Sequence, residues 1–394
     1  MWDTNPQQFW LRGERPDHVV QYDEELGFWN VYGYPEAIEI LGDWGRFSSN
    51  ITRLFTASTD ESLFEGDLLK MDPPTHRKLR RLVSHAFTPK VVADLEPRIA
   101  ELTHELLDTV TDNEFELVRD LAYPLPVIVI AELLGLPSSD RDLFKQWVDK
   151  IFEDTNQVSL KDFKDADETG QQEELRKQLD DIAPMTDYLL EHAAERRRSP
   201  RPGLLSDLVH AEVDGERLSD TEVVNFTTLL LVAGHITTTM LLGNTVLCLD
   251  ANPDQFAKVR ENRNIIPSAI EESLRFLSPF PAVARLTNKP ETVAGVEIPA
   301  DQLLMVWVGA ANRDARQFAN PDVFDVTRDH NPHLGFGRGV HFCLGAPLAR
   351  LEGRIALDIL LDRFPRLRTD PDRRPTFMPS PNLTGVQTLP LLTD

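Results

Sequence analysis

Cysteine is scarce in this sequence, with two residues, Cys248 and Cys343, among 394. So few cysteines exclude the disulfide framework that stabilises small secreted domains. A long apolar run is also missing. The most apolar stretch, residues 226–249, is interrupted by threonines, Asn244 and His235, and it falls short of the roughly 18 uninterrupted apolar residues of a membrane span. The first residues lack the basic and apolar regions of a signal peptide. We therefore expect a cytoplasmic protein that does not bind a membrane.

Positive charge is in the minority, because 41 Lys and Arg face 64 Asp and Glu and give a net charge of −23. An excess of negative charge opposes nonspecific binding to nucleic acid, so we expect no nucleic-acid partner. Hydrophobic residues at 41% and charged residues at 27% are ordinary for a globular chain. The sequence shows no internal repeat and no low-complexity linker. We therefore expect residues 1–394 to form one domain.

The most distinctive stretch is residues 333–345, His-Leu-Gly-Phe-Gly-Arg-Gly-Val-His-Phe-Cys-Leu-Gly. Its glycines allow tight turns and close approach to a flat partner. A helical apolar period follows over residues 344–364, which places Cys343 at the start of a helix. Partial positive charge there favours a thiolate, and nearby amides such as that of Gly345 can donate to the sulfur. Taken alone, a single cysteine is more often a small buried hydrophobic residue.

The pattern Phe-Gly-x-Gly-x-His-x-Cys-x-Gly over residues 336–345 resembles the haem-binding loop of the cytochromes P450. The resemblance implies a haem b cofactor (iron protoporphyrin IX) with Cys343 as the axial iron ligand. It also implies haem contacts from Phe336, Gly337, His341 and Gly345. The fold it implies is mainly α with a small β-rich region, and the haem lies between a long central helix and the cysteine loop.

The coarse pattern of the chain agrees with such a fold. Helical periods cover residues 90–111, 124–135, 139–154 and 171–198, with two more at 253–262 and 265–277. The longest run begins after Ser219, which forms a capping box with Glu222, and ends near residue 249. A hairpin is expected at residues 17–33 and short strands within 282–308.

Four basic residues are implied as partners of the two haem propionates. His76 and Arg80 are four residues apart and share a helical face. Arg285 follows the helix at 265–277, and His341 lies two residues before Cys343. An arginine fork suits a carboxylate. Each of the four alone would more often be a surface charge.

Glu272 and Arg275 are three residues apart and share a face of their helix. An isolated pair of this kind is usually an exposed intrahelical ion pair. The P450 resemblance instead implies a buried triad with Arg328. A buried ionic group fixes register more than it adds stability, so we assign these residues a structural role.

The long central helix carries the sequence Ala-Gly-His-Ile-Thr at residues 233–237. The resemblance places Ala233 against the haem and makes Thr237 the catalytic residue, with its hydroxyl assisting oxygen activation. Many bacterial members carry Asp or Glu immediately before this threonine, where the present chain has Ile236. His235 does not replace the acid, because two residues along a helix turn the side chain by about 200° relative to Thr237. Protons therefore arrive through Thr237, water and substrate, or the chemistry differs from ordinary hydroxylation.

The resemblance also implies a substrate pocket beneath the loop at residues 48–70. Its members are mostly apolar and suit a hydrophobic small molecule. They are Phe55, Leu63, Phe64, Leu229, Val232, Ile236, Phe280, Ala282, Val283, Asn382 and Leu383.

The implied activity is that of a haem–thiolate monooxygenase, which inserts one oxygen atom from O2 into a hydrophobic organic substrate. Hydroxylation in secondary metabolism or catabolism is the expected reaction. Two electrons would pass from NAD(P)H through ferredoxin reductase and ferredoxin. Basic residues Arg77, Lys78, Arg81 and Arg338 would attract an acidic ferredoxin to a monomeric enzyme.

Two alternatives stay open. Ile236 favours a P450-fold enzyme with atypical chemistry, either peroxide-driven oxygenation or oxidative coupling. The arginine near the threonine that is usual in peroxygenases is missing. A haem binder without catalysis is the second alternative, and Thr237 argues against it.

Overall fold

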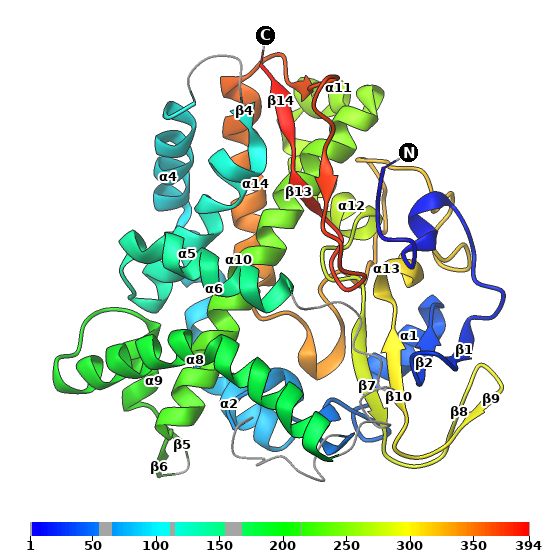
Figure 1. Cartoon of the computed structure of the whole chain (residues 1–394). Helices are drawn as coiled ribbons and strands as arrows, with labels where there is room; N and C mark the ends of the chain where they lie inside the picture. The colour runs from blue at the N-terminus through cyan, green and yellow to red at the C-terminus, as the bar shows by residue number, and fades with distance from the viewer. Residues whose placement is uncertain (1, 55–64, 111–114, 154–167, 214, 394) are drawn as a thin grey trace.

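The structure is a computed structural model that describes residues 2–54, 65–110, 115–153, 168–213 and 215–393. Helices make up most of it, and the largest sheet lies along one side of the helical part (Figure 1). The helices are α1 (Tyr34–Gly42), α2 (Thr75–Ser84), α3 (Pro89–Asp94), α4 (Glu96–Asp108), α5 (Pro124–Leu134), α6 (Arg141–Glu153), α8 (Glu168–Arg198), α9 (Leu204–His210), α10 (Asp220–Ala251), α11 (Pro253–Glu261), α12 (Ile266–Phe276), α13 (Val308–Ala311) and α14 (Ala346–Arg363).

The strands are short. They are β1 (Val20–Asp23), β2 (Phe28–Val31), β3 (Phe47–Ser48), β4 (Phe115–Glu116), β5 (Glu212–Val213), β6 (Glu216–Arg217), β7 (Val283–Thr287), β8 (Glu291–Val293), β9 (Val296–Ile298), β10 (Leu303–Val306), β11 (Arg368–Thr369), β12 (Thr376–Phe377), β13 (Val386–Thr388) and β14 (Pro390–Leu392). The expected mainly α fold with a small β region is confirmed.

Helix α10 runs through the centre of the molecule (Figure 1). The expected capping box starts it, since Ser219 Oγ accepts from the Glu222 N–H at 3.0 Å and Glu222 Oε2 accepts from the Ser219 N–H at 2.8 Å. Most side chains of the helix are buried, and from Thr238 to Leu249 all of them are, which is typical of a core helix. Among the described residues it is the one helix long and apolar enough to cross a membrane, but 61% of its most apolar window is buried in the protein.

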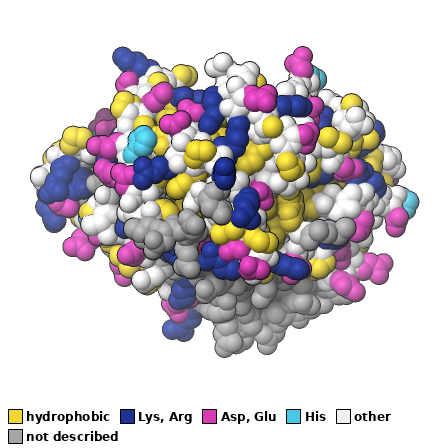
Figure 2. All heavy atoms as spheres, turned by 90° about the horizontal axis from the view of Figure 1, so that it is seen from above, with side chains coloured by type: hydrophobic (Ala, Val, Ile, Leu, Met, Phe, Trp, Pro, Cys, Tyr) yellow, Lys and Arg dark blue, Asp and Glu magenta, His cyan; other side chains and the backbone are white. Residues whose placement is uncertain are grey.

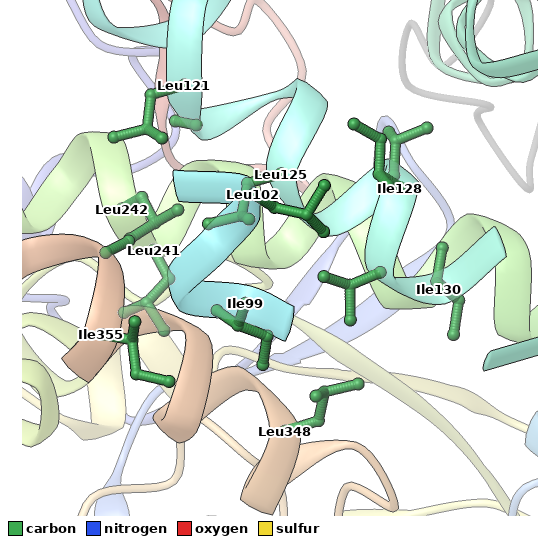
Figure 3. Close-up of a cluster of buried hydrophobic side chains, with 14 of the residues drawn as sticks. Ile99, Leu102, Leu121, Leu125, Ile128, Ile130, Leu241, Leu242, Leu348 and Ile355 are labelled. Carbon is green, nitrogen blue, oxygen red and sulfur yellow. The ribbon is translucent and has the colours of Figure 1, made fainter. Parts of the chain in front are cut away.

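The main hydrophobic core surrounds α10. Figure 3 shows side chains of α4, α5, α10 and α14 meeting in one cluster, including Ile99, Leu125, Leu241 and Ile355. Each of these side chains is at most 5% exposed. Fully burying one such side chain stabilises the fold by about 1.5–3 kcal/mol. The four helices therefore form a rigid support for the residues at their ends.

The largest sheet has the strand order β1-β2-β10-β7-β3. The hairpin expected at residues 17–33 is confirmed as β1 and β2, with Val20 opposite Val31. Strand β10 is parallel to β2 and antiparallel to β7. Val31 and Val306 pack against α1 in a second cluster. This arrangement fixes β7, which carries Arg285.

Proline accounts for two differences from the expected helices. The run expected at 90–111 is divided into α3 and α4 because Pro97 lies in the first turn of α4, where its missing N–H is tolerated. Pro347 likewise lies in the first turn of α14. That helix therefore begins at Ala346 rather than 344, and Cys343 lies in the loop three residues before it.

Charges of both signs are interspersed on the molecular surface that Figure 2 shows, with apolar side chains exposed among them. This face is the upper end of the view in Figure 1. A mixed surface produces no strong field of one sign. The net charge of −23 is therefore not concentrated on this face.

Candidate functional site

The loop before α14 holds Cys343 in a fixed position. Gly337 and Gly339 have φ of 69° and 71°, in the left-handed region that side chains other than glycine rarely adopt. A Cβ on Gly339 would also lie 2.5 Å from the Leu41 carbonyl oxygen. The Cys343 N–H donates to the Phe336 carbonyl at 2.9 Å. The loop therefore folds back on itself and presents the sulfur beside α14.

Cys343 is half-buried, and burial raises the pKa of its thiol. The N–H groups of Gly345 and Ala346 donate toward the sulfur and lower the pKa, as do the charges of Arg80 and Arg350. The desolvation effect is the largest of these. The two amides at the start of α14 thus favour the thiolate, as expected from the sequence, but burial opposes them. A bound metal cation would overcome the effect of burial, because coordination deprotonates a thiol.

The structure brings His76, His341 and Arg285 together. The imidazole rings of His76 and His341 are 4.2 Å apart. Neither ring nitrogen of His76 has a hydrogen-bond partner among the described residues, although the side chain is 1% exposed. An unsatisfied buried donor costs about 1–3 kcal/mol. This cluster is therefore built to receive an anionic or hydrogen-bonding ligand.

Burial lowers the pKa of each basic group in this cluster. Burial lowers the pKa of His76 to about 4, and the charge of Arg80 adds to the effect. Burial and Arg285 lower the pKa of His341 to about 3. Burial also lowers the pKa of Arg285 to about 10, partly offset by Asp72. Two carboxylates entering the cluster would favour the charged forms, since opposite charges within a few ångströms raise the pKa of a base.

Arg80 also ties α2 to the cysteine loop. Its guanidinium donates to the Val340 carbonyl at 3.0 Å and to the Phe342 carbonyl. The sequence did not predict these bonds. A guanidinium has five N–H donors, so they leave further donors for a carboxylate.

One face of α10 is open where the helix is otherwise buried. Ala233 is exposed and Thr237 is half-buried. His235 and Ile236, which lie between them in sequence, are buried. The Thr237 hydroxyl donates to the Ala233 carbonyl at 2.9 Å. At Gly234 an added Cβ would lie 2.9 Å from Ile130, so the missing side chain lets α10 pack against α5. The open face suits a flat group lying beneath the helix.

The residues expected to line the substrate pocket differ in how deeply they are buried and in which cluster they join. Ile236 and Leu383 lie together in an apolar cluster with Met240. Ala282 packs among Trp10, Tyr32 and Trp307, because it lies directly before β7 and faces that aromatic cluster. Phe280 is 44% exposed, and Leu229, Val232, Val283 and Asn382 are half-buried. Phe55, Leu63 and Phe64 lie outside the described residues.

The implied triad of Glu272, Arg275 and Arg328 forms one network. Arg275 donates to both carboxylate oxygens of Glu272, at 2.7 and 2.8 Å, and both side chains are 0% exposed. Arg328 Nε donates to Glu272 Oε2 at 3.1 Å. Arg275 also donates to the carbonyls of Asn312, Pro321 and Val323. Removing one partner of a buried pair costs about 3–5 kcal/mol, so this network fixes the chain from 312 to 331 on α12.

Three further residues beside the loop were missed from the sequence. Glu271 accepts from His333 Nε2 at 3.0 Å and from Arg350 Nε at 2.7 Å. Glu271 is separated by 62 residues from His333 and by 79 from Arg350, so no local spacing rule could pair them. The one available signal was that His333 and Arg350 flank the cysteine loop in sequence.

Comparisons with known proteins agree with this site. A family model described as cytochrome P450 matches residues 22–392. The chain is 44% identical over 361 residues to cyclomarin C epoxidase CymV of Salinispora arenicola, covering 91% of this chain and 89% of that protein. It is 43% identical over 389 residues to erythromycin C-12 hydroxylase of Saccharopolyspora erythraea, covering 97% and 93%.

Solved structures agree as well. HmtN, a post-tailoring hydroxylase of himastatin biosynthesis, is 56% identical with a TM-score of 0.88 and covers 100% of this chain and 98% of its own. A structure described among unusual P450-like monooxygenases of microbial secondary metabolism is 52% identical with a TM-score of 0.94, and both chains are covered completely.

The chain belongs to the cytochrome P450 family. It is a P450 monooxygenase, a haem- and iron-binding oxidoreductase. The residues present fit the haem, because the loop offers one sulfur, the orphaned nitrogens of His76 lie in a basic cluster, and α10 has an open face at Ala233 and Thr237.

We predict that Cys343→Ser abolishes the thiolate-type spectrum of the reduced, CO-bound protein. Serine keeps the size of the side chain but is a poor ligand for iron, whereas the helical core lies elsewhere. Far-ultraviolet circular dichroism should therefore stay largely helical. Cys248→Ser serves as the control, because Cys248 is buried in the main core, and it should keep the spectrum. An unchanged spectrum in Cys343→Ser would exclude Cys343 as the ligand.

Proposed function

We propose that this P450 inserts one oxygen atom from O2 into a hydrophobic product of bacterial secondary metabolism, by hydroxylation or epoxidation. The observation that carries the reaction class is the loop that fixes Cys343 before α14, and the open face of α10 at Thr237 supports it. The substrate class is supported by relatives that are named as an epoxidase of cyclomarin C and a hydroxylase of erythromycin. Mostly apolar walls suit such a molecule.

Each site residue has a separate task in this proposal. Cys343 would bind the iron of the haem, which would supply the oxidising chemistry when it is bound. His76, His341, Arg285 and the remaining donors of Arg80 would hold its propionates. Phe336, Gly337 and Gly345 would contact it from the loop side, and Ala233 from α10.

Thr237 and its neighbours would control protons and water. The Thr237 hydroxyl donates to the Ala233 carbonyl, and rotation about χ1 would turn its proton toward a substrate or a water. Ile236, Met240 and Leu383 form the apolar cluster beside it. These apolar side chains can neither donate nor accept a proton, so the Thr237 hydroxyl would be the group that does so.

Electrons would come from NAD(P)H through ferredoxin reductase and ferredoxin. Arg80 binds the carbonyls around the cysteine loop, so the exposed Arg77 and Arg81 of the same helix lie close to that loop. Arg338 is exposed within the loop itself. These charges would attract an acidic protein to this face. We further propose a cytoplasmic, monomeric enzyme that forms one domain and binds neither membrane nor nucleic acid.

Atypical chemistry is the second candidate, and the placement of Ile236 favours it. The side chain is 8% exposed and lies in an apolar cluster, with no acid at that position to supply protons. A peroxide-driven reaction or an oxidative coupling needs less proton delivery from the protein. A haem protein without catalysis is disfavoured by the hydroxyl of Thr237 on the open face.

The reaction class is tested by turnover in labelled dioxygen. We expect macrolides or hydrophobic cyclic peptides to shift the haem spin state on binding, because they displace water from the apolar pocket. With ferredoxin, reductase and NAD(P)H, the product should gain one oxygen atom that carries the label. Loss of two hydrogens without added oxygen would indicate coupling. Product formed with peroxide but not with NAD(P)H would indicate the peroxide-driven alternative.

Docking of ferredoxin is tested by charge reversal. Arg81→Glu should slow reduction by ferredoxin about tenfold at low salt, because repulsion replaces attraction, and the difference should shrink as salt screens it. Arg374→Glu is the control, since Arg374 is exposed between β11 and β12, outside α2 and the cysteine loop. Equal rates in both variants and the wild type would remove this face as the docking site.

The role of Ile236 is tested with a matched pair of variants. Ile236→Glu should raise the product formed per NAD(P)H, because a general acid contributes about 10²–10⁴-fold to a proton-transfer step. Ile236→Gln has nearly the same shape but cannot release a proton at neutral pH, so it should leave the yield unchanged or lower. Thr237→Ala should lower the yield and increase peroxide.

Burying the new carboxylate raises its pKa, so thermal unfolding of both Ile236 variants is measured first. Tight coupling in the wild type together with a loss in Ile236→Glu would mean that protons arrive by another route.

A further inference from the structure

Glu271, His333 and Arg350 form a cluster at the start of the cysteine loop, which we call the loop clamp. Arg350 of α14 donates to Glu271 of α12 through Nε at 2.7 Å and Nη2 at 2.8 Å. His333 Nε2 lies 3.0 Å from the same carboxylate. The Gly335 N–H donates to His333 Nδ1 at 3.1 Å. The clamp therefore joins two helices to the first residues of the loop.

The charges of the clamp follow from these bonds. Nδ1 of His333 accepts from the Gly335 N–H, and Nε2 faces the Glu271 carboxylate. Burial raises the pKa of Glu271, but the hydrogen bonds from Arg350 and His333 outweigh it and bring the pKa to about 2. The clamp thus contains one carboxylate and one guanidinium at neutral pH.

Arg350 also contacts the cysteine loop directly. Its guanidinium lies over the Phe336 ring, 4.5 Å from the centroid, and the Phe336 carbonyl accepts from the Cys343 N–H at 2.9 Å. Arg350 lies in the second turn of α14, the helix that begins three residues after Cys343. The guanidinium is therefore stacked on the loop residue whose carbonyl holds the Cys343 backbone.

The clamp also forms part of the wall of a surface groove of about 680 Å³ between α3, α4, α12 and α14. Arg354, one turn after Arg350 on α14, lines the same groove and pairs with Glu96 at 2.8 Å. The Arg350 and Arg354 side chains are equally exposed, at 40% each. Arg354 thus faces α4, whereas Arg350 stacks on the cysteine loop. The chain therefore provides a matched pair of arginines that differ in their contact with the loop.

We propose that Arg350, held by Glu271, is a positioning residue that withdraws electron density from the Cys343 thiolate and thereby raises the reduction potential of the bound haem iron. The proposal rests on the proposed ligand role of Cys343. Reduction adds one electron from the reductant to the ferric iron and so adds one negative charge to the site. A nearby guanidinium stabilises that charge, and the Glu271 carboxylate weakens the stabilisation.

The two partners should therefore have opposite effects. Arg350→Gln removes the positive charge, so at a fixed potential the ferrous-to-ferric ratio should fall by roughly three- to tenfold, as expected for a partly screened unit charge. A tenfold change corresponds to about 59 mV for one electron. Glu271→Gln removes the negative charge and should raise the ratio. The double variant should lie between the two single variants.

A purely structural role predicts another pattern. Either single variant breaks the same hydrogen bonds and loosens the same loop, so both would shift the ratio in one direction. Arg350→Lys retains the charge with fewer hydrogen bonds and should stay near the wild type. Arg354→Gln removes an equally exposed charge from the groove and should change the ratio by less than twofold.

The experiment is a spectroelectrochemical titration of the substrate-free, haem-loaded wild type and these five variants. The reduced-CO spectrum of each sample shows whether thiolate ligation is intact. Opposite shifts for Arg350→Gln and Glu271→Gln would support the proposal. Shifts in the same direction, no shift, or a shift in Arg354→Gln as large as in Arg350→Gln would overturn it. A wild type without the thiolate spectrum would instead refute the ligand role of Cys343, and the clamp proposal with it.

Discussion

Two adjacent carboxylates on α12 hold the site together. Glu272 is turned into the protein, where it binds Arg275 and Arg328 and fixes the chain from 312 to 331. Glu271 is turned toward α14 and binds Arg350 and His333. Consecutive residues on a helix differ by about 100° in direction, so one turn of α12 anchors both the segment before the cysteine loop and the helix after it. The loop is therefore fixed at both of its ends.

Burial affects the pKa values of the residues expected to hold the cofactor more than the charges of neighbouring side chains do. Burial moves His76, His341 and Arg285 toward their neutral forms and also raises the pKa of the Cys343 thiol. Each of these groups is thus held in an unfavourable environment that a ligand with one metal cation and two carboxylates would relieve. Buried polar groups without partners are uncommon in folded proteins. Among these four, the two ring nitrogens of His76 lack partners among the described residues, and they are the physical counterpart of the haem implied by the family.

How much of this could be predicted depended on the distance in sequence between interacting residues. The loop around Cys343, the capping box at Ser219 and most helices were predictable because each depends on neighbours within a few residues. The start of α14 was predicted at residue 344 rather than at Ala346, because the apolar period extends back past Pro347 into the loop. The carbonyl bonds of Arg80 and the clamp at Glu271 were not predictable, since both join segments that only the fold brings together. The effect of the α14 amides on Cys343 was predictable from the sequence, but the opposing effect of burial was not, because desolvation cannot be evaluated before burial is known.

The apolar cluster around Ile236 bears both on which substrates fit and on how protons reach the site. Ile236, Met240 and Leu383 exclude water from one side of Thr237, and none of them can donate a proton. In the proposed enzyme, a substrate that fills this space with hydrocarbon completes the exclusion of water, whereas one that carries a hydroxyl group adds the missing donor. The same side chains would then determine both which substrates bind and how efficiently electrons reach product. Selectivity in such a site would depend on where the substrate places its own polar group, because Ile236, Met240 and Leu383 offer none.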